Sequence, residues 1–229
     1  MKRRLRHLVL GIAVLSALAV LATCAQVLAL RWHDPEATAW MRMRERQARE
    51  RGRTLELRRT WVPLERIPRD LQRAVILAED GSFPAHHGFD WAAIRAARAR
   101  NDRAQRVKVG GSTITQQLAK NLFLSPARTW VRKGREAVIT VAMELLLPKD
   151  RILELYLNSI EFGPGVFGVA EAARHHFGVP VERLSREQCC RLAAIIPAPL
   201  RYRIGGEYVG RRAAQLAAMM GPEPPASSR

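Results

Sequence analysis

The feature that most constrains this chain is an uncharged apolar run near its N-terminus, from Leu8 to Leu30. Its only polar or glycine interruptions are Gly11, Ser16, Thr23 and Gln26. A helix of this length reaches about 34 Å, enough to cross a hydrocarbon core about 30 Å thick. A cleavable signal peptide has a shorter apolar region of about 7–15 residues, although the small residues at 23–25 are compatible with a cleavage site. We therefore predict an uncleaved transmembrane anchor over residues 8–30.

Basic residues flank this run on both sides. The segment 1–7 carries Lys2, Arg3, Arg4 and Arg6, and five arginines follow the run within about 20 residues. Long C-terminal domains cross the membrane largely regardless of charge, so the short N-terminal cluster is the better guide to orientation. We expect residues 1–7 to be cytoplasmic and the body of the chain to lie outside the cytoplasm.

The charge balance indicates an anionic partner. The 229 residues include 38 Lys and Arg against 21 Asp and Glu, a formal net charge of +17. Nucleic acid, a lipid surface and a phosphate-bearing substrate all fit such an excess. Most of the 33 arginines are compatible with solvated background positions, but four of the five lysines lie between 108 and 149. Because a compact ammonium and a planar guanidinium suit different sites, this window is where we look for chemistry.

Beyond the anchor, the pattern predicts one mainly α-helical domain. Residues 31–62 are Arg-rich and indicate a juxtamembrane helix or linker near anionic headgroups, 63–220 form the domain, and 221–229 form a disordered tail. Apolar residues recur at helical spacing from Leu71 to Ala78, and prolines separate later segments. Further helices are predicted at 90–100, 113–124, 130–146, 150–158, 166–176, 185–195 and 207–220. Three cysteines exclude a disulfide scaffold.

The first candidate for chemistry is the adjacent pair Glu79 and Asp80 at the end of a predicted helix. A loop with Phe83, His86 and His87 follows. Carboxylates at a helix C-terminus oppose the macrodipole, and a buried one with a raised pKa would suit a general base. The alternative is structural: Asp80 caps the loop and His86 satisfies a backbone group.

The second candidate is the helix that follows Gly110 and Gly111. Thr113 and Gln116 have the spacing of a capping box, and such an N-terminus can receive an anion. Thr113, Gln117 and Lys120 then share one helix face. The Gly-Lys-Ser/Thr ending of a phosphate-binding P-loop is absent. A well-capped, solvated helix is the alternative.

The third candidate is a cluster of cations around Glu136, formed by Arg128, Arg132, Lys133 and Arg135. Arg132 and Glu136 are four residues apart, so an exposed helix pair would explain them most simply. Four cations around one acid are better used by a diphosphate. In the next helix, after Lys149, the apolar residues are most simply core.

Together these segments resemble the peptidoglycan glycosyltransferases of family 51, the family that includes the glycosyltransferase domain of penicillin-binding proteins. The resemblance covers about residues 65–200. It rests on five motifs in the family's order: EDGSFPAHHGFDW, GGSTITQQLAKNLF, RKGRE, KDRILELYLN and RLAAIIPAP. The sequence has one predicted anchor and lacks the Ser-x-x-Lys and Lys-Thr-Gly strings of a transpeptidase domain. In both respects it resembles the monofunctional members of the family.

The resemblance implies a lysozyme-like helical fold with a small lobe that dips into the bilayer. It implies polymerisation of lipid II into β-1,4-linked glycan, with release of undecaprenyl diphosphate, at the periplasmic face of the inner membrane. Glu79 would deprotonate the acceptor hydroxyl in an inverting attack. Glu136 would assist the diphosphate leaving group, directly or through Mg²⁺ or Mn²⁺. The residues implied to shape the pocket and hold diphosphate and sugar are Asp80, Phe83, His86, Ser112, Thr113, Gln117, Lys120, Asn121, Arg128, Arg132 and Lys133.

The expected partners are therefore lipid II, the growing glycan chain, membrane lipids and proteins of cell-wall synthesis or division; nucleic acid is not expected. One rival interpretation is a membrane-bound lytic transglycosylase or lysozyme, which also uses carboxylates but has no use for a diphosphate-binding cluster. The other is a non-enzymatic basic protein whose affinity for any polyanion falls smoothly with salt.

Overall fold

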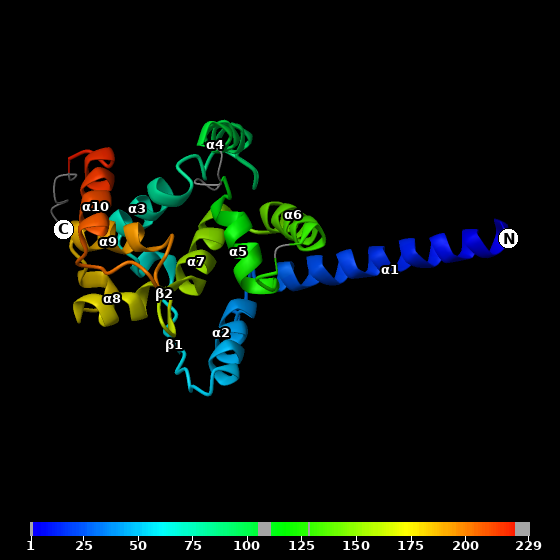
Figure 1. The fold of residues 1–229 in the computed structure, drawn as a ribbon, viewed down its shortest axis with the longest axis horizontal. Helices are drawn as coiled ribbons and strands as arrows, with labels where there is room; N and C mark the ends of the chain where they lie inside the picture. The colour runs from blue at the N-terminus through cyan, green and yellow to red at the C-terminus, as the bar shows by residue number, and fades with distance from the viewer. Residues whose placement is uncertain (1, 105–110, 128, 223–229) are drawn as a thin grey trace.

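The computed structural model describes residues 2–104, 111–127 and 129–222 and is mainly helical (Figure 1). Its α-helices are α1 Lys2–Ala29, α2 Ala39–Glu50, α3 Arg69–Glu79, α4 Trp91–Ala104, α5 Ile114–Phe123, α6 Trp130–Leu146, α7 Lys149–Ser159, α8 Val169–Phe177, α9 Arg186–Ile195 and α10 Glu207–Met219. Its short strands are β1 Arg58–Arg59, β2 Glu161–Gly163 and β3 Val166–Phe167, and its 3₁₀ turns are η1 Leu64–Arg66 and η2 Val181–Arg183. The predicted mainly α fold class is confirmed, and each predicted helix matches an observed one. Most of the predicted tail at 221–229 lies outside the described residues.

Helix α1 projects from the body as one long rod (Figure 1). Its segment Val9–Ala29 is long and apolar enough to cross a membrane. The end of this helix is part of the body, because Val27 is fully buried and Leu30, just beyond it, is 8% exposed. Arg151 of α7 fixes the exit from the helix: its guanidinium donates to the carbonyl of Leu30 at 2.8 Å and to Asp34 at 2.7 Å.

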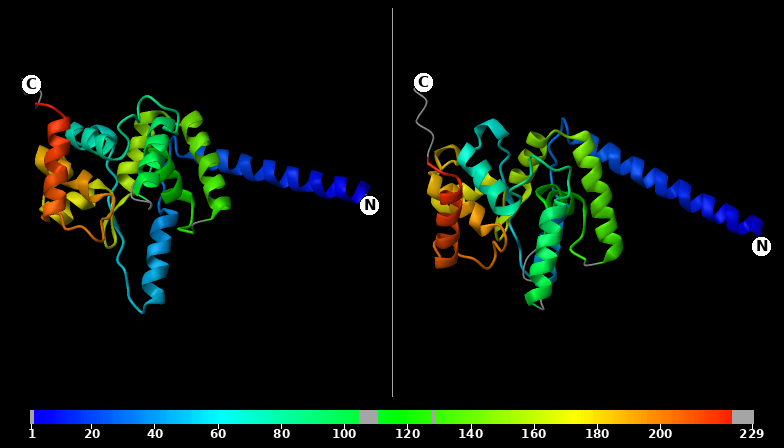
Figure 2. Two further views of the ribbon diagram at one scale, coloured as in Figure 1. Left: turned by 45° about the horizontal axis from the view of Figure 1, so that its top comes forward. Right: turned by 90° about the horizontal axis from the view of Figure 1, so that it is seen from above.

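The core is centred on α7, which is buried on several faces. Ile152, Leu155, Tyr156 and Leu157 have no exposed surface, the pattern of a helix enclosed by its neighbours. Helix α5 covers it toward α1 and is itself covered by α6, while α3, α8, α9 and α10 form the end of the molecule away from α1 (Figures 1 and 2). The catalytic candidates on α3, α5 and α6 are therefore mounted on packed helices.

A three-stranded sheet joins the segment after α2 to the middle of the chain. Strand β3 lies between β1, to which it is parallel, and β2, to which it is antiparallel. Gly165 sits in the turn at φ +73°, and a Cβ there would stand 2.2 Å from the carbonyl oxygen of Glu56. The buried Asn158 of α7 adds a second tie, since its amide accepts from the backbone N–H of Val62 and donates to the carbonyl of the same residue, both at 2.9 Å. Residues 31–62, which we predicted as a juxtamembrane helix or linker, thus contribute a helix and a strand to the body.

Candidate active site

A cleft of about 620 Å³ lies where α2, α3 and α5 face the segment that follows α9. One wall carries carboxylate, amide and ammonium groups, and the other is rich in proline. The cleft is lined by Trp40, Arg44, Glu79, Gln117, Lys120, Asn121, Ile160, Glu161, Ile196 and residues 197–201. Four of the residues predicted to carry the chemistry, Glu79, Gln117, Lys120 and Asn121, therefore meet in one cavity.

Glu79 is the last residue of α3, and a hydrogen-bonded relay holds its carboxylate. The side-chain amide of Gln117 donates to it at 2.8 Å, and the hydroxyl of the fully buried Tyr156 donates to the amide oxygen of Gln117 at 3.0 Å. Burial raises the pKa of Glu79, against the opposing effects of the Gln117 hydrogen bond and the Lys120 charge. Burial also raises the pKa of Tyr156 well above its usual value, so Tyr156 stays a neutral donor. Glu79 is thus a fixed carboxylate of increased basicity facing the cleft.

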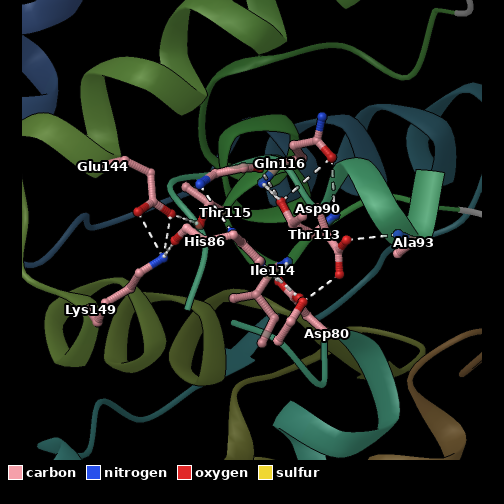
Figure 3. A network of polar contacts seen from close by, with 12 residues as sticks. Asp80, His86, Asp90, Ala93, Thr113, Ile114, Thr115, Gln116, Glu144 and Lys149 are labelled. Atoms are coloured by element: carbon pink, nitrogen blue, oxygen red, sulfur yellow. Dashed lines mark hydrogen bonds and ion pairs between the residues drawn. The ribbon is translucent and has the colours of Figure 1, made fainter. Parts of the chain in front are cut away.

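Asp80 and His86 fasten the loop after α3 to the start of α5 (Figure 3). One oxygen of the buried Asp80 accepts from the backbone N–H of Ile114 at 3.0 Å, and His86 Nε2 lies 2.9 Å from the other. His86 Nδ1 accepts from the backbone N–H of Gly88 at 3.1 Å, which makes Nε2 the protonated nitrogen that donates to Asp80. Both residues hold the loop in place, as the structural alternative expected, and Asp80 also borders a smaller cavity beside Glu79.

Helix α5 begins with the predicted capping box. The Thr113 hydroxyl accepts from the backbone N–H of Gln116 at 3.2 Å, and the Gln116 side chain accepts from that of Thr113 at 3.0 Å. The same hydroxyl donates to the carbonyl of Gly88 at 2.7 Å, so the cap also binds the loop. Ser112, immediately before it, is exposed at the mouth of the cavity that Lys133 borders.

A partly buried ion pair lies beneath this loop (Figure 3). The Lys149 ammonium donates to Glu144 at 2.8 Å and to the carbonyl of His86 at 2.7 Å, and it stands 4.5 Å from the centre of the Phe83 ring. The Thr115 hydroxyl donates to the same Glu144 carboxylate. Phe83, which the motif implied would shape the pocket, is buried and supports the loop through this lysine.

Glu136 lies on α6 between two cations. Arg132 donates to one of its carboxylate oxygens and Lys133 to the other. Glu136 is only 3% exposed, so the simple interpretation of an exposed helix pair is wrong. Among the described residues, the buried Nε–H of Arg132 has no hydrogen-bond partner. Arg128 lies outside the described residues.

Lys120 connects the two acids electrostatically. Burial lowers the pKa of its ammonium, while Glu136 and, to a smaller extent, Glu79 raise it. Both carboxylates are therefore close enough to act on one lysine, although 57 residues separate them in sequence. The arrangement supplies a base at one end, an acid among cations at the other, and an ammonium between them.

Comparison with known proteins identifies the class to which this arrangement belongs. Residues 45–220 match the family model described as transglycosylase. Three relatives named biosynthetic peptidoglycan transglycosylase show the extent of the likeness. The protein of Azoarcus sp. (strain BH72) is 49% identical over 84% of this chain and 86% of its own length. The protein of Stutzerimonas stutzeri (strain A1501) is 45% identical over 94% of this chain and 90% of its own length. The protein of Neisseria meningitidis serogroup C (strain 053442) is 51% identical over 73% of this chain and 72% of its own length.

The chain belongs to the transglycosylase family. Family membership makes it a glycosyltransferase, and the family's lysozyme-like helical fold is the one observed. The matched region begins inside α2, so the transglycosylase unit includes part of the segment that the sequence placed between anchor and domain.

Sequence reasoning missed the contribution of α2 and β2 to the transglycosylase cleft. Trp40 and Arg44 line it from α2, and Glu161 lines it from β2. No local pattern marks these residues: Arg44 lies in an Arg-rich segment, and Glu161 is 117 residues away from it in sequence. Only the fold brings them together.

Within the described ranges, no three His, Cys, Asp or Glu side chains gather as metal ligands. The Glu136 carboxylate already accepts from two cations, which a divalent ion would have to displace. A divalent cation at the diphosphate stays a prediction, and we derive no step through one.

Proposed function

We propose that this transglycosylase polymerises lipid II into β-1,4-linked glycan and releases undecaprenyl diphosphate. The observation that supports this most strongly is the pairing of Glu79, half-buried and of raised pKa, with a second acid set among cations. Bond formation needs a base at the acceptor hydroxyl, and departure of a diphosphate needs positive charge. A glycan-cleaving enzyme would use the two carboxylates but would have no diphosphate for the cations to stabilise.

In this proposal, Glu79 accepts the proton of the acceptor hydroxyl as that oxygen attacks C1 of the growing chain. The C1–oxygen bond to the diphosphate breaks on the opposite face, so α-linkage becomes β-linkage. Gln117 keeps the Glu79 carboxylate oriented by its hydrogen bond. Lys120, Arg132 and Lys133 stabilise the negative charge that develops on the departing diphosphate, and Glu136 holds the last two in position.

Helices α1 and α6 support the proposal that this reaction occurs at a membrane surface. Helix α1 lies against α6, and α6 turns an apolar face to the outside. Its outward side chains include Trp130, Val131, Val138, Val141 and Leu145, with Trp130 91% and Leu145 78% exposed. A contiguous exposed apolar face beside a membrane-spanning helix is typical of a membrane contact. We place the catalytic domain on the periplasmic face of the inner membrane, with α6 in the outer leaflet.

The test is an assay of the purified full chain with labelled lipid II. We expect polymer from the wild-type chain and a loss of at least about a hundredfold in rate for Glu79→Gln, the size of a general-base contribution. Glu65→Gln, which removes an exposed carboxylate outside the cleft, is the matched control and should retain the rate. Normal turnover by Glu79→Gln would overturn the role of Glu79. Shortening of preformed glycan without polymer formation would overturn the proposed reaction.

A further inference from the structure

Helix α2 forms one wall of the catalytic cleft. It contacts α5, and its Trp40 and Arg44, one turn apart, both reach the cavity that Glu79 and Lys120 line. Figure 1 shows α2 below α5. A helix expected to lie at the membrane surface thus supplies side chains to the site of the reaction.

Glu161 fixes both of these side chains. One of its carboxylate oxygens accepts from the indole N–H of Trp40 at 3.1 Å, and the other accepts from Nε of Arg44 at 2.9 Å. Glu161 is only 8% exposed, and a carboxylate so placed is stable only when it is paired and hydrogen-bonded. The indole ring is therefore held in one orientation by a partly buried hydrogen bond.

That orientation sets the Trp40 ring beside the lysine of the cleft. The ammonium nitrogen of Lys120 lies 5.6 Å from the centre of the ring, within the range of a cation–π interaction. A lysine side chain has a flexible four-carbon stem, so a point charge at its end needs neighbours that keep it in place. The other groups that act on Lys120 are Glu79 from α3 and Arg132, Lys133 and Glu136 from α6.

We propose that Trp40 is a positioning residue for Lys120, held in place by the buried Glu161–Arg44 pair. This inference rests on the proposed function, because it assumes that Lys120 stabilises the departing diphosphate. It assigns to α2 a role in the reaction itself, besides its packing against α5. If Trp40 instead contacted the sugar directly, its loss would weaken substrate binding and leave the charged step unaffected.

Kinetics with lipid II separate these cases. We expect Trp40→Leu to lower kcat about tenfold with KM within about twofold, since a desolvated cation–π contact is worth about 1–2 kcal/mol and acts here in the charged step. Trp40→Phe keeps an aromatic face and should restore most of kcat. The matched control is Trp61→Leu: the Trp61 indole also donates to a glutamate, Glu154, and lies under Arg59 and Arg151, but it lies outside the cleft. We expect that control to lower thermal stability and to leave kcat unchanged.

A second measurement tests the contact without turnover. The chain has only five lysines, so reductive ¹³C-methylation gives a simple spectrum in which Lys120→Arg identifies the Lys120 signal. We expect an upfield ring-current shift of that signal in the wild-type chain, lost in Trp40→Leu and retained in Trp40→Phe and Trp61→Leu. A Lys120 signal that Trp40→Leu leaves in place would overturn the inference. So would a wild-type kcat in Trp40→Leu, or a raised KM alone. Absence of polymerisation by the wild-type chain would instead overturn the proposed function.

Discussion

Glu79 ends α3 with its carboxylate partly withdrawn from water at the cleft, and this desolvation raises its pKa. Because the folded-state pKa lies above the unfolded-state value, the ionised carboxylate destabilises the folded chain at pH above both. We expect Glu79→Gln, which keeps an oxygen for the Gln117 amide, to raise the unfolding midpoint at about pH 8. The gain should shrink as pH falls and vanish below about pH 4, where the carboxyl is protonated in both states. Thermal unfolding of both chains in one detergent checks this; a gain that grew on acidification would contradict it.

Residue-level roles on α5 were only partly predictable from sequence. The spacing of Thr113, Gln117 and Lys120 predicts one polar face, and the cap at Thr113 is confirmed. The structure divides that face among three partners: Thr113 binds the loop, Gln117 orients Glu79, and Lys120 lies beside Trp40. These partners come from different elements, and helical periodicity carries no information about what a face will meet.

At the scale of the element, the loop between α3 and α4 depends on the partly buried pair Glu144 and Lys149, in which the carboxylate is the more enclosed group. Removing one partner leaves an uncompensated buried charge, whereas removing both can be nearly neutral. We expect Lys149→Met to lower the free energy of unfolding by about 2 kcal/mol, because the Glu144 carboxylate loses its partner, and to reduce activity through the loosened loop. Lys149→Met combined with Glu144→Leu should recover much of the stability.

Chemical denaturation of the three chains checks this expectation, with Arg211→Met as a control that removes an exposed cation from the pair with Glu207 on α10. The control should change stability by no more than about 1 kcal/mol. A double variant less stable than Lys149→Met alone would contradict the argument.

Element positions were predictable wherever one segment buries a periodic apolar face, as in α3, α6 and α7. The Arg-rich sequence of α2 predicted a helix or linker near headgroups, because its few apolar residues form no long stripe. What places it is a set of contacts distant in sequence: Arg44 and Trp40 to Glu161, and Val62 to Asn158. Such pairings follow from the path of the chain, which the pattern of one segment does not contain.

At the scale of the whole molecule, the anchor and the catalytic body form one continuous structure. The end of α1 is buried against the body at Val27 and Leu30, and Arg151 bonds the turn that follows. Beyond that turn, α2 enters the cleft through Trp40. The contacts of Arg151 and Trp40, with the short segment between them, therefore connect the apolar helix α1 to Lys120 in the cleft.

The apolar face of α6 beside the anchor predicts a second membrane contact. Trp130 begins this face and is 91% exposed, so in our proposal its indole lies among lipid acyl chains or headgroups. We expect that, for the full chain in vesicles of brominated phosphatidylglycerol and phosphatidylethanolamine, Trp130→Phe removes a large share of the lipid-quenchable tryptophan emission. Trp61→Phe, which removes a half-buried indole away from this face, should leave that share unchanged. Equal quenching in the wild-type and Trp130→Phe chains would mean that α6 stays in water, and that the anchor alone holds the enzyme at its lipid substrate.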